Sequence, residues 1–137
     1  MRILGICSSP KGSRSTTLRL VQAALEGAGE NGAETELVDL CQLDIKYCNA
    51  CQTCFKTGKC VHKDDFQGLY EKILMADGLI LGSPNYFHTV TAQLKTLIDR
   101  QVLLQPGHRR QQLRPGHWLS GQLDGQLRRF CYRQRRS

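Results

Sequence analysis

Residues 2–17 have the sequence RILGICSSPKGSRSTT, in which a short apolar run leads into a polar turn rich in hydroxyl groups. The run Arg2–Cys7 predicts a buried strand, since an unbroken apolar segment suits a strand that is covered on both faces. Residues 8–13 interrupt the strand with Pro and Gly, and Ser15 or Thr16 can cap a following helix. A strand, a loop and a helix in this order predict the first half of a βαβ unit.

The same alternation continues to about residue 100. Further strands are predicted over 34–40 and 79–82, with a loop containing Cys and Gly at 41–63 between them. Apolar residues at helical spacing predict three helices, marked by Leu18, Val21, Leu25 and Ala28; by Phe66, Leu69, Tyr70, Ile73 and Leu74; and by Val90, Leu94, Leu97 and Ile98. The second of these is expected to start at Asp64 or Asp65. Strands that alternate with helices predict an α/β fold with a parallel sheet.

Length and composition narrow the class of protein. The chain has 137 residues, 40% of them hydrophobic and 23% charged, which predicts one globular domain rather than a disordered or membrane-spanning chain. No signal peptide is recognisable, so a cytoplasmic location is expected. The net charge of +7 comes entirely from residues 101–137, which hold eight arginines and one acid. The first 100 residues carry no net charge, and binding to nucleic acid is therefore not expected of them.

Residues 101–137 differ in composition from the rest of the chain. They contain no Lys, Ile, Thr, Asn or Met, which are the amino acids encoded only by codons that begin with A. A shifted reading frame after about residue 100 and a genuine basic low-complexity extension both explain this bias. Neither a fourth nor a fifth strand is recognisable there. We therefore expect a domain over 1–100, an irregular tail over 101–137 and an incomplete sheet.

Two loops are expected at the carboxyl edge of the sheet, where parallel sheets bind their ligands. The first, residues 8–17, offers hydroxyl groups, Lys11 and the N-terminus of a helix, and this combination favours a phosphate group. It lacks the spacing of a Walker loop and of a dinucleotide-binding Gly motif. The second, residues 83–89, places Tyr86 and Phe87 beside Asn85 and His88, which suits a flat heteroaromatic ring. In isolation, the first loop also fits an ordinary polar turn with helix caps, and the second fits a Pro turn with two core aromatic residues.

Together these loops resemble the NADPH-dependent FMN reductase and flavodoxin-like superfamily, in its iron–sulfur flavoprotein branch. The resemblance rests on Gly5-Ile6, on Ser9 to Gly12 followed by Ser and Thr, and on the segment 83–100. It implies a flavodoxin-like doubly wound sheet that binds FMN. It also implies that Ser9, Lys11, Ser15, Thr16 and Thr17 hold the phosphate, and that Pro84, Asn85, Tyr86, Phe87 and His88 contact the isoalloxazine ring. Ser8 departs from the family, which usually has Gly at this position.

Four cysteines lie within one short loop, at Cys48, Cys51, Cys54 and Cys60. Three thiolates spaced by two residues can surround a cubane from a single turn, whereas structural zinc usually takes two separate Cys-x2-Cys pairs. The spacing therefore favours a 4Fe–4S cluster in the loop 46–63, with zinc or unliganded thiols as the alternatives. Cys7 and Cys41 are expected to be small buried residues at strand ends.

The leading hypothesis is an oxidoreductase in which FMN takes a hydride from NAD(P)H and passes single electrons to the cluster. NAD(P)H is implied by the resemblance alone, and ferredoxin is an equally plausible electron donor. No side chain is expected to act as acid or base. The resemblance implies a homodimer or higher homo-oligomer, since flavin and cluster communicate between subunits in this family. Two alternatives stay open: a zinc-stabilised binding module with a basic tail for nucleic acid, and an inactive truncated flavoprotein.

Overall fold

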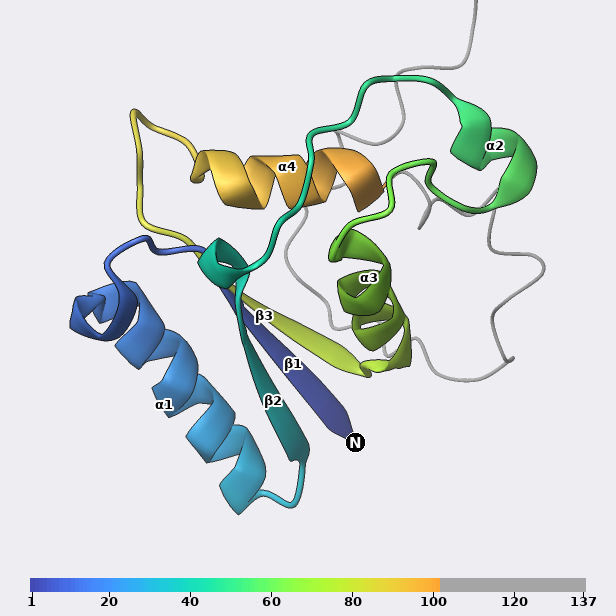
Figure 1. Ribbon diagram of the computed structural model, residues 1–137. Coiled ribbons are helices and arrows are strands. Elements are labelled where there is room, and N and C mark those ends of the chain that lie inside the picture. Colours follow the sequence, from blue (N-terminus) through green and yellow to red (C-terminus); the bar gives the residue numbers. More distant parts are fainter. Residues whose placement is uncertain (102–137) are drawn as a thin grey trace, which may run out of the picture.

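Three parallel strands form the centre of the fold in the computed structural model, which describes residues 1–101 (Figure 1). They are β1 (Arg2–Cys7), β2 (Glu34–Asp39) and β3 (Gly78–Gly82), in the order β2-β1-β3. The register pairs Cys7 with Asp39 on one side and with Gly82 on the other. The predicted parallel α/β sheet is thus confirmed, and its strands end at one common edge.

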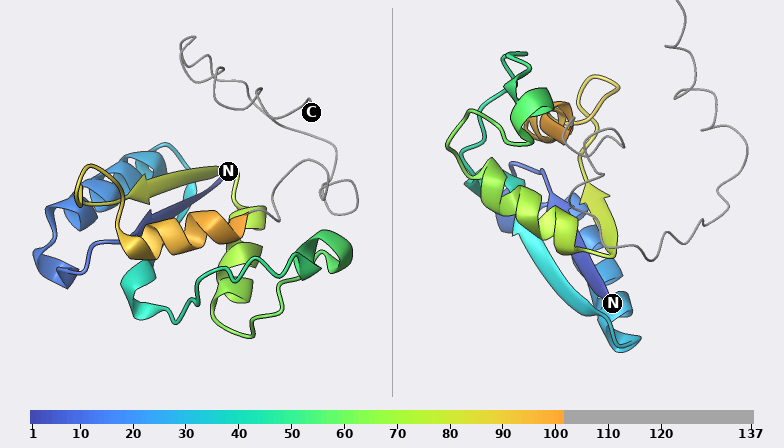
Figure 2. Two further views of the ribbon diagram at one scale, coloured as in Figure 1. Left: turned by 90° about the horizontal axis from the view of Figure 1, so that it is seen from above. Right: turned by 90° about the vertical axis from the view of Figure 1, so that its right-hand side faces the viewer.

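Helices cover both faces of this sheet (Figures 1 and 2). Helix α1 (Thr16–Glu30) packs on one face, and α3 (Phe66–Met75) and α4 (Ala92–Arg100) lie on the other. The short helix α2 (Thr53–Thr57) lies within the cysteine-containing loop, away from the strands. Single 3-10 turns occupy Gly12–Arg14 and Leu40–Gln42. The covering of both faces explains why β1 is apolar from Ile3 to Cys7.

Helix α1 begins where the sequence predicts it, because the Ser15 side chain accepts a hydrogen bond from the backbone N–H of Leu18 at 3.1 Å. Its buried residues Val21 and Leu25 face the sheet at two glycines. A Cβ atom on Gly5 would lie 2.6 Å from Leu25 Cδ1, and one on Gly82 would lie 2.3 Å from Val21 Cγ2. These glycines allow the helix to approach β1 and β3 closely.

The opposite face of the sheet carries the main hydrophobic core. Leu4 and Ile6 of β1 pack there with residues of the two helices that cover them. The buried helix residues are Phe66, Leu69 and Ile73 of α3 and Leu94 and Leu97 of α4. Alternation along β1 sends its side chains to the two faces in turn, so this one strand supports both layers.

The structure corrects the expectation for α4 in two respects. Val90 precedes the helix, and Ile98 is 45% exposed instead of facing the core. The buried face of α4 is made by Leu94, Leu97 and Arg100. The expected domain boundary, the irregular tail and the missing strands fall on residues beyond 101 and lie outside the described part of the chain. Within residues 1–101, no helix is both long and apolar enough to cross a membrane.

The glycine at the end of β3 provides a test of this packing. Replacing Gly82 by Ala forces a methyl group against Val21, and we expect the free energy of unfolding to fall by about 1–3 kcal/mol. Gly27 lies inside α1 with nothing near its Cβ position, so Gly27→Ala should instead stabilise the chain by about 0.5–1 kcal/mol. Chemical denaturation of both variants compares them directly. Equal effects of the two substitutions would contradict the close contact between α1 and β3.

Candidate cofactor site

Two loops lie side by side at the carboxyl edge of the sheet, one after β1 and one after β3 (Figure 1). Ser8, the first residue of the loop after β1, is bonded to Gly82, the last residue of β3. Its backbone N–H and its side-chain hydroxyl both donate to the carbonyl oxygen of Gly82, at 2.8 and 3.1 Å. Because β2 and β3 flank β1 on opposite sides, the chain reverses its winding between β1 and β3. This reversal is the point at which open parallel sheets hold their ligands, and flavodoxin-like sheets hold FMN.

The loop after β1 presents the N-terminus of α1. Of the first four amides of this helix, Leu18 donates to the Ser15 hydroxyl and Arg19 to the Ser15 carbonyl. Since first-turn amides have no partner within a helix, this leaves the N–H groups of Thr16 and Thr17 for a ligand. A 3-10 turn at Gly12–Arg14, with Gly12 at φ +52°, bends the loop back over this helix end. The arrangement suits an anion.

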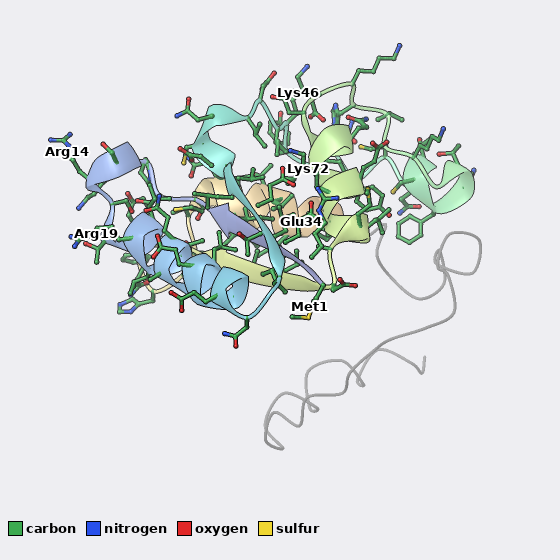
Figure 3. The ribbon with its side chains drawn as sticks, turned by 90° about the horizontal axis from the view of Figure 1, so that it is seen from below. Met1, Arg14, Arg19, Glu34, Lys46 and Lys72 are labelled. Carbon is green, nitrogen blue, oxygen red and sulfur yellow. The ribbon has the colours of Figure 1, made fainter. Side chains whose placement is uncertain are left out.

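The residues predicted to hold a phosphate occupy different depths in this loop. Ser15 is fully buried and its hydroxyl caps the helix, whereas Lys11 and Thr16 are exposed and Thr17 is half-buried. Ser9 is 4% exposed. Arg14, which the sequence also places here, points away from the fold at the outer tip (Figure 3). The predicted residues thus share one loop, in which Ser9 and Ser15 are buried and Lys11 and Thr16 are exposed.

The loop after β3 ends in a tight hairpin. Tyr86 and Thr89 exchange both backbone hydrogen bonds, at 2.9 and 3.0 Å, and the two residues between them have positive φ. Phe87 at φ +47° and His88 at φ +64° adopt a conformation that suits Gly or Asn, which costs about 1–3 kcal/mol for each residue. Phe87 is 97% exposed, so no core packing explains its strained backbone.

The base of this hairpin is connected to α4. The Ser83 hydroxyl accepts a hydrogen bond from the backbone N–H of Thr91 at 3.0 Å and donates to the carbonyl of Pro84. Thr91 is fully buried and its own hydroxyl caps α4. Pro84 is half-buried and Asn85 is exposed, so the ring-loop residues Pro84 to His88 run outward from a fixed base.

The four clustered cysteines lie on the loop that carries α2, at the other end of α4 from the hairpin (Figure 1). Cys48 and Cys51 are exposed, and Cys54 and Cys60 are half-buried. Burial raises the pKa of the Cys54 thiol, and negative charge on the other three cysteines raises it further. The pKa of Cys51 is lowered, because the backbone and side chain of Thr53 donate hydrogen bonds to its sulfur. Cys54 thus lies within electrostatic reach of the other three cysteines.

The cysteines are not assembled into a ligand set. Within residues 1–101, no group of three or more His, Cys, Asp or Glu side chains is close enough to hold a metal ion. Their loop is instead closed at its base, where Asp44 and Asp65 are joined by two hydrogen bonds and the backbone N–H of Lys46 donates to Asp64 at 2.9 Å.

Arg100 is a residue of this region that the sequence analysis missed. It is 2% exposed, donates to Cys60 Sγ at 3.3 Å and pairs with Asp64. Burial would lower the pKa of Arg100, but the hydrogen bonds to Asp64 and Cys60 outweigh burial and raise it. Helical spacing could have indicated this residue, since it lies three positions after the buried Leu97 and so on the same face.

Sequence comparison relates the chain to named redox proteins. An iron–sulfur flavoprotein from Methanocaldococcus jannaschii is 44% identical over 107 residues, which cover 78% of this chain and 55% of the relative. One from Methanosarcina thermophila is 41% identical over 105 residues, or 77% of this chain and 54% of the relative. The chain therefore spans about half the length of these curated relatives.

Solved structures with the same fold include a flavone reductase, at 31% identity and a TM-score of 0.59 over 74% of this chain and 30% of that one. The NAD(P)H:quinone oxidoreductase from Methanothermobacter marburgensis has a TM-score of 0.60 at 23% identity, over 73% of this chain and 52% of its own. The second likeness supports the fold alone. Both agree with the flavodoxin-like arrangement of β1, β2 and β3.

A family match covers most of the sequence. Residues 1–122 match the family described as NADPH-dependent FMN reductase, and the match continues past residue 100, where the resemblance was expected to end. The matched range includes both loops at the carboxyl edge and all four clustered cysteines. The chain therefore belongs to the NADPH-dependent FMN reductase family.

Proposed function

We propose that this chain is an FMN-dependent oxidoreductase that transfers electrons between NAD(P)H or a ferredoxin and an acceptor through a 4Fe–4S cluster. The observation that carries the proposal is the meeting of two loops at the β1/β3 edge, one suited to an anion and one to a ring. The family match supports FMN, and the names of the curated relatives support the cluster. Bound FMN would convert hydride transfer into single-electron transfer, which the cluster would then carry.

The chain's own residues fit FMN at both of its ends. For the phosphate, Lys11 supplies a positive charge, Thr16 and Thr17 supply hydroxyl groups and two amides, and Ser9 supplies a further hydroxyl. Ser15 is fully buried, and its hydroxyl caps the helix that presents these groups. Pro84, Asn85, Tyr86, Phe87 and His88 supply the ring contacts. The strained hairpin at Phe87 and His88 supports this role, since backbone strain on a surface loop is retained where the loop contacts a ligand.

The cysteines fit an iron–sulfur cluster by the chemistry of their donor atoms. Cys48, Cys51, Cys54 and Cys60 offer four thiols from one loop, and thiolates are the donors that hold such clusters. The loop is closed at its base by Asp44, Asp64 and Asp65, so only the segment that carries the thiols needs to adjust around a cluster.

The positions of the two loops and the cysteines support a homodimer or higher homo-oligomer. The hairpin and the cysteines lie at opposite ends of α4, and a helix of nine residues is about 13 Å long. Both the hairpin and Cys48 and Cys51 are exposed, so a second copy of the chain can approach either one. We therefore propose that the ring loop of one subunit faces the cysteines of another.

The phosphate loop can be tested by comparing two flavins. Changing Ser9 and Thr16 to Ala should weaken binding of FMN, with each lost hydrogen bond to the charged phosphate costing about 1.5–3 kcal/mol, but leave riboflavin binding little changed. Fluorescence titration measures both affinities. Ser13→Ala, an exposed hydroxyl of the same loop outside the proposed set, is the matched control and should bind FMN normally. Equal losses for FMN and riboflavin would show that the loop does not recognise phosphate.

The cysteine loop can be tested by metal analysis. Protein purified without oxygen should contain about four iron atoms per chain together with acid-labile sulfide. Cys54→Ser should lose the iron and keep the flavin, whereas Cys41→Ser, outside the cluster of four, should keep both. One zinc ion per chain without sulfide would contradict the cluster and assign the loop a structural metal site.

The strained hairpin leads to a test in which stability and binding change in opposite directions. His88→Gly removes the cost of a positive φ, so the free energy of unfolding should rise by about 1 kcal/mol. The same change removes a proposed ring contact and should weaken FMN binding. Asn85→Gly is the control, because Asn85 has no positive φ and its replacement should not stabilise the chain. A His88→Gly variant of lower stability would show that the strain is absent.

A further inference from the structure

Arg100 is buried although it carries a charge, at the last residue of α4. Its side chain and that of its partner Asp64 are each 1% exposed. A buried charge is costly unless it is paired and its hydrogen-bonding groups are used. Replacing Arg100 would leave the Asp64 carboxylate buried without its partner, so the segments bonded to this pair would be destabilised.

The hydrogen bonds of Arg100 reach both ends of the cysteine loop. Its Nη1 donates to the carbonyl oxygen of Lys46 at 3.0 Å, where the loop begins, and to Asp64 Oδ2, where the loop ends. The same Asp64 oxygen accepts the backbone N–H of Lys46 at 2.9 Å. One guanidinium thus joins the two ends of the loop to α4.

The second terminal nitrogen of the forked guanidinium group, Nη2, contacts a sulfur atom. Arg100 Nη2 donates to Cys60 Sγ at 3.3 Å, and the guanidinium carbon lies 4.1 Å from the centroid of the Phe66 ring. Stacking on Phe66 holds the guanidinium plane, and the bonds to Asp64 and Lys46 set its direction. The positive charge is therefore held against one particular thiol of the four.

We propose that Arg100 is a positioning residue that clamps the cysteine loop to α4 and places a positive charge against Cys60, which raises the reduction potential of the cluster. The inference rests on the proposed function for its second part. Hydrogen bonds and positive charge at a ligand sulfur stabilise the more negative, reduced state of an iron–sulfur cluster. The clamp itself consists of contacts present in the chain without any metal.

The charge effect is tested in the full chain with its cluster reconstituted. Arg100→Gln removes the charge, and Lys95→Gln is the matched control, because it removes an equal charge from an exposed position of the same helix. A redox titration followed by visible absorption should give a lower midpoint potential for Arg100→Gln and an unchanged one for Lys95→Gln. Arg100→Lys restores the charge without the fork and should fall between the unaltered chain and Arg100→Gln. Equal potentials for Arg100→Gln and Lys95→Gln at full iron content overturn the proposal.

If Arg100→Gln does not fold or takes up no iron, the midpoint potential of Arg100→Lys is compared with that of the unaltered chain instead. Its potential should then lie below that of the unaltered chain, since an ammonium group cannot bond to Asp64 and Cys60 in the fixed directions of the fork. A potential equal to that of the unaltered chain overturns the claim that the two-nitrogen guanidinium places the charge against Cys60.

The clamp is tested separately by hydrogen exchange in the metal-free chain. Amides of residues 46–64 should exchange at least about tenfold faster in Arg100→Lys, while those of β1 keep their rates. Unchanged exchange over 46–64 overturns the clamp. If the unaltered chain binds no iron, the proposed function fails in its cluster, and this exchange measurement still decides whether Arg100 holds the loop.

Discussion

Close contact between α1 and the strands β1 and β3 is the constraint on which the rest of the structure depends. The contact requires glycine at two points, since a side chain on Gly5 or Gly82 would overlap Leu25 or Val21. With α1 held on one face, the second crossover packs on the other face and brings β3 to the free side of β1. The loops after β1 and β3 then start from the paired residues Cys7 and Gly82, and for this reason the two loops lie next to each other.

Much of this fold could be predicted from the sequence because its signals are local. The cap at Ser15, the apolar run of β1 and the breaks after both strands depend on residues a few positions apart. Periodicity was less informative for α4, where Ile98 suggested a buried position but is exposed. The buried face of a short helix depends on what packs against it, and there Phe66 and Asp64 favour Arg100.

Part of the candidate site could also be predicted from local sequence signals, and part of it could not. The two loops were predictable, because the carboxyl edge of a parallel sheet brings together whatever follows its strands. The placement of the cysteines was not, although their spacing indicated their chemistry. Their loop is bonded to Arg100, which lies 54 positions from Lys46 and 40 from Cys60, and spacing within the loop carries no information about so distant a contact. Which residue each ligand atom of FMN contacts also stays a prediction.

Helix α4 connects the two halves of the site. At its start Thr91 bonds to Ser83 at the base of the ring loop, and at its end Arg100 bonds to Cys60. Because Thr91 and Arg100 are both buried, the helix fixes the base of the hairpin and Cys60 at its two opposite ends, which are about 13 Å apart. For the proposed electron transfer, in which no side chain acts as acid or base, such a fixed separation is the main contribution a protein scaffold can make. In the proposed oligomer, where the exposed hairpin of one subunit faces the exposed cysteines of another, this spacing within each subunit would also constrain the spacing between subunits.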